Sequence, residues 1–385
     1  MAALKIVAAG DFHFGNPRIR PDELYEKIKK YFYPEVLKSH LVLLTGDTYD
    51  QLTTVNSQAN KYVAMFIKDL FTMSAKFGIQ VRILHGTYTH DRDQVSVCNS
   101  LMIPGTRAKI IDEIFAEEIT DFKNGEGDVP GKLRILYIPD NLPYKKSEDV
   151  ITHIRKVYSV VGWQKSDLVL GHGTFSHALP CDIEHGPACM YTIEQFSDIV
   201  EDNAPIIMGH IHTPSRKNNV YYCGSFDRMS HGEEEPKGFF TFSKENGIWN
   251  AKFIRNEDAT LFTTVTVQED TPDKAVDYFI KFVSENFPNK SGHVRVVNPL
   301  PEIRTLLHKI CAQEFPSIIY TSKSNADKDK VSIKIADVSL DVFEDVKPNV
   351  HNLGDLVYQY LLEKDLLGPM TKEEVVESVH VLITG

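Results

Sequence analysis

Aspartate and histidine side chains recur directly after short apolar runs in the first 212 residues, a combination that binds divalent metal ions. Five such segments follow one another along the chain: Asp11-Phe12-His13, Gly46-Asp47-Thr48-Tyr49-Asp50, Gly86-Thr87-Tyr88-Thr89-His90-Asp91, Gly171-His172-Gly173 and Gly209-His210-Ile211-His212. Residues two apart in an extended segment point the same way, so Asp11 and His13 can bind one ion. The same holds for His210 and His212. Mixed carboxylate and imidazole donors suit Mn²⁺, Fe²⁺ or Zn²⁺ better than Mg²⁺ or Ca²⁺.

A carboxylate that bridges two metal ions about 4 Å apart is the core of many phosphoester-hydrolysing sites, because a hydroxide between the ions can attack phosphorus in line. We expect Asp47 to be this bridge. Each segment alone also has an ordinary explanation: Asp47 and Asp50 suit helix N-caps, and His172 suits a buried core position. Five segments in this order, each after an apolar run, favour the metal centre.

The elements that must position these side chains are predicted by the apolar runs themselves. The runs cover residues 4–10, 41–46, 81–86, 133–139, 167–173 and 205–212. Near-continuous apolar runs of this length are typical of strands buried on both faces. Between them lie helical stretches such as 60–78, where Val63, Phe66, Ile67 and Leu70 share one face and Gly78 suits a C-cap.

This alternation of strands and helices predicts an α/β layered sheet, in which ligands gather beyond the carboxyl ends of the strands. Runs at 220–226, 238–243 and 249–255 predict consecutive strands that close the domain antiparallel. We therefore expect a first domain over residues 1–257.

The pattern changes after residue 257. Strands are predicted at 261–267, 294–297, 318–320 and 331–335, with helices at 272–287 and 301–315. This order indicates a small α+β domain over 258–340. Two further helices, at 353–367 and from Thr371 onward, form a C-terminal segment over 341–385.

The overall composition limits the classes of protein. A chain of 385 residues exceeds one typical core, and no apolar stretch reaches the roughly 18 residues of a membrane span. The five cysteines are sparse and odd in number, which favours reduced thiols and a cytoplasmic protein. The net charge of −11 argues against strong autonomous binding to nucleic acid, since such proteins usually carry a basic face. A DNA enzyme of this charge is expected to depend on a partner.

The five segments together resemble the calcineurin-like metallophosphoesterase superfamily. Within it the chain resembles the SbcD / Mre-eleven type DNA-repair nuclease subunit, phage versions included. Three features indicate this type within the superfamily: the Gly-Ser turn in 222–228, the acidic stretch at 232–235 and Lys237-Gly238-Phe239. The resemblance covers residues 5–240 closely. For residues 258–340 only the order of domains is similar, because the family has a DNA-capping domain at this place. For residues 341–385 the similarity is limited to predicted helices, where the family has helices that bind the coiled coil of an ATPase partner.

The resemblance implies a four-layer sandwich, with two mixed β-sheets flanked by helices. It also implies a Mn²⁺-dependent DNA nuclease, with 3′→5′ exonuclease and single-strand endonuclease activity, that works in DNA repair and recombination. Two divalent ions are implied, Mn²⁺ first and Mg²⁺, Fe²⁺ or Zn²⁺ as alternatives. The implied partners are DNA, a second copy of the chain and an SbcC-type coiled-coil ATPase, in a bacterial or phage-infected cytoplasm without membrane contact.

The family's metal ligands can be placed residue by residue. The first ion would be held by Asp11, His13, Asp47 and His212, and the second by Asp47, His172 and His210. The family completes the second set with the Asn of Gly-Asn-His-Asp, and this chain departs from that pattern. Matching the His-Asp pair puts Thr89 in the ligand position, whereas matching the glycine puts Thr87 there. We expect Thr89, with water, a backbone carbonyl or His90 as alternatives.

Other roles follow from the same comparison. His90 matches the family's catalytic histidine, which would protonate the leaving 3′ oxygen. Asp91 and Asp50 would orient His90 and a metal ligand. The DNA-contacting residues are expected to be Arg92, Arg18 and Arg228.

Two other functions use the same residues. One is a phosphatase or cyclic-nucleotide phosphodiesterase with the same metal core, which the domain after residue 258 disfavours. The other is a scaffold that has lost catalysis. Loss of catalysis should remove several ligands, and only one is altered here.

Overall fold

The computed structural model describes residues 3–124, 127–140, 142–178, 189–268, 271–289, 291–298 and 300–323. Nearly all of them belong to one compact unit, formed by Met1–Val296 and Glu302–Ser322. The strand predicted at 331–335 and both helices predicted within 341–385 lie outside the described residues. The expected domain boundaries after residues 257 and 340 therefore stay predictions.

The first sheet has six strands in the order β14-β13-β1-β2-β3-β4. They are β1 (Leu4–Ala9), β2 (Leu41–Leu44), β3 (Gln80–Leu84), β4 (Ala108–Ile111), β13 (Gly238–Glu245) and β14 (Ile248–Arg255). Strands β1 to β4 are parallel, and β13 pairs antiparallel with both β1 and β14. The predicted strands at 4–10, 41–46 and 81–86 are confirmed, and each ends just before the residues expected to bind metal.

The second sheet has the order β11-β12-β10-β7-β6-β5. Its strands are β5 (Phe115–Asn124), β6 (Gly127–Ile138), β7 (Leu168–His172), β10 (Ile206–Gly209), β11 (Ser215–Lys217) and β12 (Val220–Tyr222). The four central strands are parallel. The expectation of antiparallel closing strands is confirmed for β13 and β14 but is wrong in part for 220–226, because β12 pairs in parallel with β10 and antiparallel only with the short β11. Gly224, with φ +72°, then turns the chain toward the first sheet, where Ser225 bridges Gly10.

The helices beside these sheets are α1 (Pro21–Lys27), α2 (Tyr33–Lys38), α3 (Gln58–Phe77) and α6 (Ser147–Val161), with a π-helical turn at Ile28–Phe32. In α3 the Ser57 side chain accepts a hydrogen bond from the Asn60 amide, and Gly78 ends the helix in the left-handed region. The predicted apolar face of α3 is confirmed, since all four of its residues are buried.

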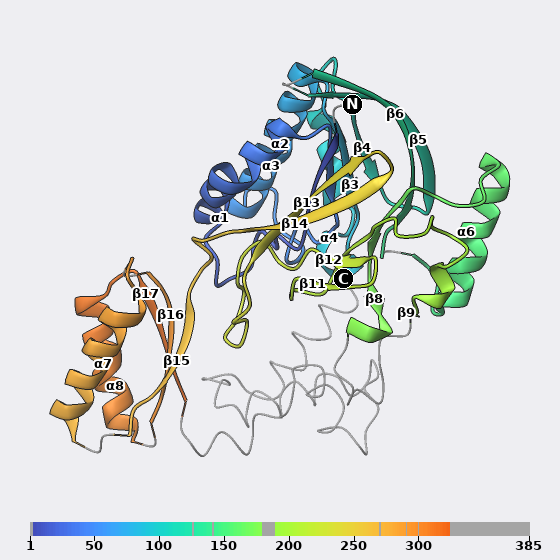
Figure 1. Ribbon diagram of the computed structural model, residues 1–385. Coiled ribbons are helices and arrows are strands. Elements are labelled where there is room, and N and C mark those ends of the chain that lie inside the picture. Colours follow the sequence, from blue (N-terminus) through green and yellow to red (C-terminus); the bar gives the residue numbers. More distant parts are fainter. Residues whose placement is uncertain are drawn as a thin grey trace, which may run out of the picture. The chain divides into compact units, whose positions relative to one another are not determined.

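Three hydrophobic cores separate four layers. In β1, Val7 packs on the helix side with α3, whereas its neighbours Ile6 and Ala8 pack between the two sheets. In the second sheet, Val169 packs toward α6 and Leu170 toward the first sheet. Figure 1 shows α1, α2 and α3 together on one side of the sheets and α6 on the other. The α/β sandwich explains the near-continuous apolar runs, because successive side chains enter different cores.

The remaining elements are short, or belong to the part after residue 257. The short ones are α4 (Tyr88–Asp91), α5 (Gln94–Val97), β8 (Thr174–Phe175), β9 (Met190–Tyr191) and 3₁₀ turns at Cys98–Leu101, Ser176–Ala178 and Glu194–Phe196. The later ones are β15 (Phe262–Thr266), α7 (Pro272–Asn286), β16 (Gly292–Val297), α8 (Pro301–Glu314) and β17 (Ile318–Lys323). Their three strands form a sheet, as expected for a small α+β arrangement. Within the described ranges, no helix is long and apolar enough to cross a membrane.

Candidate metal centre

The carboxyl ends of β1, β2 and β3 in the first sheet and of β7 and β10 in the second bring the five predicted segments together. The Asp11 amide donates to the Gly46 carbonyl at 3.0 Å, and the His13 amide donates to the Asp47 carbonyl at 3.1 Å. Three groups of side chains have donor atoms within 4.8 Å of one another: Asp11, His13 and His212; Asp47, His172 and His210; and His13, Asp50 and His90.

The backbone at these positions is held in an unfavourable conformation. Eight described non-glycine residues have positive φ, and four of them are in this centre: Asp11 (49°), His13 (49°), Asp47 (50°) and His210 (88°). Such conformations typically persist at functional sites because the surrounding structure enforces them. Here the loops that contain Gly46 and Gly86 pack so closely that neither position has room for a side chain. A Cβ on Gly46 would lie 2.6 Å from the Gly86 Cα, and a Cβ on Gly86 would overlap the Asp47 amide.

The first group is arranged as a set of metal ligands. The Nε2 atoms of His13 and His212 lie 3.1 Å apart. The Asp11 Oδ1 accepts a hydrogen bond from the His210 amide at 2.9 Å, whereas its Oδ2 is buried without a hydrogen-bond partner. A buried carboxylate oxygen without a donor is costly unless a cation binds it. These residues therefore fit a bound metal ion, as predicted for Asp11, His13 and His212.

Asp47, which belongs to the second group, also lies near the first. The Asp47 Oδ2 atom lies 3.3 Å from the His172 Nε2 and 3.8 Å from the His13 Nε2. Its other oxygen, Oδ1, accepts a hydrogen bond from the Thr87 amide at 2.6 Å, which fixes the carboxylate plane. One oxygen of Asp47 thus faces both groups, the arrangement expected of a bridging ligand.

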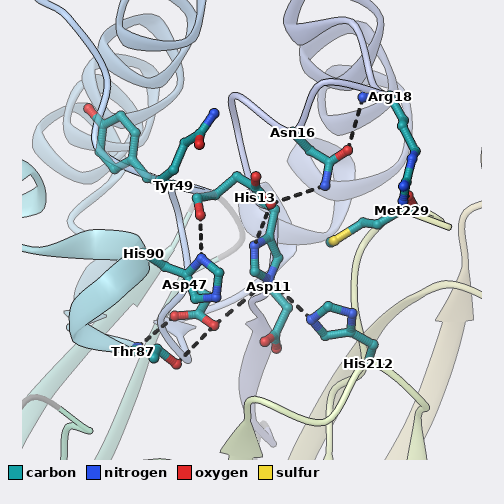
Figure 2. Close-up of polar contacts among 12 residues, drawn as sticks. Asp11, His13, Asn16, Arg18, Asp47, Tyr49, Thr87, His90, His212 and Met229 are labelled. Carbon is teal, nitrogen blue, oxygen red and sulfur yellow. Dashed lines mark hydrogen bonds and ion pairs between the residues drawn. The ribbon is translucent and has the colours of Figure 1, made fainter. Parts of the chain in front are cut away.

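The outer nitrogens of two imidazoles lie close to oxygen acceptors. His172 Nδ1 lies 2.7 Å from the Thr45 carbonyl, and His13 Nδ1 lies 3.2 Å from Asp50, which itself accepts from Asn16 at 3.0 Å. Figure 2 shows His13 in the middle of this cluster, with Asn16 on one side and His212 on the other. Metal-binding histidines usually carry such partners, because these fix the tautomer and raise ligand basicity. Asp50 therefore supports His13, and Asn16 supports Asp50.

His90 and Asp91 lie on the single helical turn α4, directly after the β3 loop. The half-buried His90 ring lies 4.8 Å from the His13 ring between centroids, and its Nδ1 contacts the Asp50 carbonyl oxygen. Asp91 is buried and accepts hydrogen bonds from the Tyr49 amide at 3.0 Å and the Gly86 amide at 2.8 Å. Burial and the nearby Asp47 carboxylate raise the pKa of Asp91 to about 7. Asp91 thus joins the loops that follow β2 and β3, a positioning role.

The structure places Thr87, rather than Thr89, against the second group. Thr89 is exposed, because α4 begins directly after Thr87 and its first two side chains, Tyr88 and Thr89, point outward. The Thr87 hydroxyl lies 3.2 Å from the His172 Nε2.

The three arginines predicted to contact DNA differ in their surroundings. Arg228 is half-buried, and its guanidinium donates to the carbonyls of Ala259, Thr260 and Glu235 at 3.2–3.4 Å. Arg18 is exposed and donates to the Met229 carbonyl at 3.3 Å, and Arg92 is exposed. Backbone carbonyls thus hold the head group of Arg228, and a DNA contact by any of the three stays a prediction.

Glu233 and Lys237 contact His212 of the candidate metal centre, a role that the sequence did not predict for them. Lys237 is only 1% exposed; its Nζ lies 2.7 Å from Glu233 Oε2 and donates to the His212 carbonyl at 3.0 Å. Glu233 Oε1 lies 3.8 Å from His212 Nδ1. Burial would raise the pKa of Glu233, but His212 and Lys237 outweigh it and lower this pKa to about 2. The acidic stretch and the Lys-Gly-Phe motif were the sequence signals for this pair.

Replacing Lys237 with Met is expected to destabilise the protein by about 3–5 kcal/mol, because it leaves the Glu233 carboxylate largely buried without its cation. Urea denaturation measures the loss. The double variant Glu233→Gln/Lys237→Met should lose less than the sum of the two single variants, because the pair is coupled. Additive losses would show that the two residues act independently.

Metal affinity is expected to rise with pH. Burial alone would lower the pKa of His172, but the adjacent Asp47 carboxylate outweighs it and raises this pKa to about 10 in the metal-free protein. His172 is then protonated at neutral pH and must release a proton to bind a metal. The association constant for Mn²⁺ should increase by about tenfold per pH unit for each proton displaced. Calorimetry in buffers of different ionisation enthalpy counts the protons, and a count of zero would contradict this protonation state.

The sequence matches no protein-family model, and a search of curated proteins found no similar sequence. The functional assignment therefore depends on the chemistry of the metal centre and on the motifs of the chain itself.

Proposed function

We propose that this protein is a metal-dependent phosphodiesterase of the metallophosphoesterase sandwich type, with DNA as its substrate. The observation that carries the proposal is the position of Asp47 Oδ2, 3.3 Å from a nitrogen of His172 and 3.8 Å from a nitrogen of His13. One carboxylate oxygen is thus shared between two sets of histidine and aspartate ligands. A carboxylate shared in this way can hold two ions at the short separation that two-metal hydrolysis of phosphate esters uses.

One ion would be held by Asp11, His13, Asp47 and His212, and a second by Asp47, His172 and His210. When bound, such a pair of ions polarises the phosphate and lowers the pKa of the attacking water. Mixed carboxylate and imidazole donors favour Mn²⁺, with Fe²⁺ or Zn²⁺ as alternatives and Mg²⁺ less suited.

His90 supplies the proton in this mechanism. Its Nδ1 faces the Asp50 carbonyl, an atom that only accepts, so Nδ1 carries a hydrogen and Nε2 is the nitrogen left for proton exchange. An imidazole titrates near neutral pH and can therefore protonate an alkoxide leaving group. Asp50 and Asn16 hold the His13 ring beside it.

The preference for DNA is supported by the sequence. The Gly-Ser turn at 222–228, the Lys237-Gly238-Phe239 segment and the added α+β part resemble the SbcD / Mre-eleven nucleases more than small-molecule phosphatases. The resemblance extends the proposal to a homodimer that works with an SbcC-type ATPase in DNA repair or recombination, in a bacterial or phage-infected cytoplasm. The net charge of −11 agrees with an enzyme that obtains DNA affinity from a partner.

The test is hydrolysis of linear duplex DNA, single-stranded DNA and bis-p-nitrophenyl phosphate with Mn²⁺, each repeated with a chelator. We expect Mn²⁺-dependent cleavage of DNA that the chelator abolishes. Cleavage of the small diester alone, even with an SbcC-type ATPase added, would move the assignment to a phosphatase or cyclic-nucleotide phosphodiesterase. No hydrolysis together with no metal binding would leave a scaffold.

A further inference from the structure

The Thr87 side chain lies at the centre of the second ligand group. Its Oγ1 is 3.3 Å from Asp47 Oδ2, 3.2 Å from His172 Nε2 and 3.3 Å from His210 Nδ1. Asp47 Oδ2 and His172 Nε2 are themselves 3.3 Å apart. Figure 2 shows the hydroxyl directed at the Asp47 carboxylate from the start of α4. The Thr87 hydroxyl oxygen is thus within 3.3 Å of one donor atom from each of the three residues of the second group.

The separations from the Thr87 hydroxyl are those of neighbouring ligands on one ion. For an ion held tetrahedrally at about 2.0–2.1 Å, as Zn²⁺ is, two ligands are separated by about 1.63 times that length, or roughly 3.3–3.4 Å. In the metal-free protein, hydrogen bonds can join the same atoms, because the Thr87 hydroxyl donates one proton and the imidazole nitrogens can donate or accept. A cation bound by all four atoms would satisfy their lone pairs together.

We infer that the Thr87 hydroxyl is a ligand of the second metal ion and takes the place that an asparagine amide has in the family the chain resembles. This inference rests on the metal centre proposed above. A threonine side chain is shorter than an asparagine, so its oxygen reaches the ion only if the backbone comes closer.

The structure shows such an approach. The Thr87 amide donates to Asp47 Oδ1 at 2.6 Å, and residue 86 is a glycine whose Cβ, if present, would overlap the Asp47 carboxylate. Glycine at this position lets the β3 loop lie directly on the bridging aspartate. The absence of Asn from the third segment is therefore compensated by the Thr87 hydroxyl together with the closer approach of the loop.

The experiment counts bound metal. Wild type, Thr87→Val and Thr87→Ser are titrated with Mn²⁺ by calorimetry, and bound metal is confirmed by elemental analysis after gel filtration. Valine keeps the shape of threonine and removes the hydroxyl, whereas serine keeps the hydroxyl. We expect two ions per chain in the wild type and in Thr87→Ser. In Thr87→Val the second ion should bind roughly tenfold more weakly or worse.

Thr89→Val is the matched control, because Thr89 is exposed in the same loop, and it should bind two ions like the wild type. Thermal melting shows whether Thr87→Val is folded. If Thr87→Val does not fold, Thr87→Asn takes its place in the test; this variant restores the family ligand and should bind two ions. Two tightly bound ions in folded Thr87→Val, or failure of Thr87→Ser to bind both, would refute the Thr87 assignment and leave the two-metal proposal intact. A wild type that binds fewer than two ions would refute both.

Discussion

Asparagine in place of Asp47 is expected to abolish Mn²⁺-dependent hydrolysis and to reduce bound metal from two ions to one or none. The substitution removes the negative charge from Oδ2, the oxygen that lies 3.3 Å from His172 and 3.8 Å from His13. Because two bound ions stabilise the transition state by several kcal/mol, we expect a rate loss of about 10³-fold or more. Initial rates on linear duplex DNA and calorimetric metal titration measure the two effects.

Asp202→Asn is the matched control for Asp47→Asn. It is the same chemical change on a side chain that is 91% exposed, so both rate and metal stoichiometry should equal those of wild type. An Asp47→Asn protein that keeps two bound ions would contradict the bridging role, whatever its activity.

Asparagine in place of His90 is expected to reduce DNA cleavage by about 10²–10⁴-fold while both metal ions stay bound, since this is the usual contribution of a general acid. The effect should depend on the leaving group. The 3′ alkoxide of DNA needs a proton when it leaves, whereas p-nitrophenolate is stable as an anion near neutral pH. Hydrolysis of bis-p-nitrophenyl phosphate should therefore change much less than cleavage of DNA in the same variant.

The comparison of the two substrates distinguishes proton donation from a structural effect. His90 lies 4.8 Å from His13 between ring centroids, so its removal could also disturb a metal ligand. A structural disturbance would lower both rates equally and weaken metal binding. Equal losses on DNA and on the small diester would thus contradict the role of His90 as the acid.

The strands and the helix that position the site could be predicted because their signals are local. Val63, Phe66, Ile67 and Leu70 repeat with the helical period, and all four are buried on α3. The apolar runs before Asp11 and Asp47 predicted β1 and β2, since every residue of a doubly covered strand enters a core. The expectation that Asp and His residues after parallel strands would converge followed from the same topology, and these side chains do lie together.

Several features depended on contacts between residues far apart in the chain. Local pattern could not decide between Thr87 and Thr89, because the answer depends on where α4 begins and on which hydroxyl then faces His172. Likewise, the three buried residues of β12 read equally well as a strand in either sheet. Only the turn at Gly224 and the pairing with β10 decide that β12 belongs to the second sheet.

The sequence by itself determined which residues could bind metal and that strand ends would carry them, because residue type and hydrophobic period are properties of short segments. Only the tertiary structure decided what surrounds those residues: Lys237 and Glu233 behind His212, Asn16 behind Asp50, and backbone carbonyls around the Arg228 guanidinium. These partners are separated by up to 34 residues along the chain. Their contacts depend on the path of each loop, which side-chain packing and hydrogen bonding across the whole fold determine.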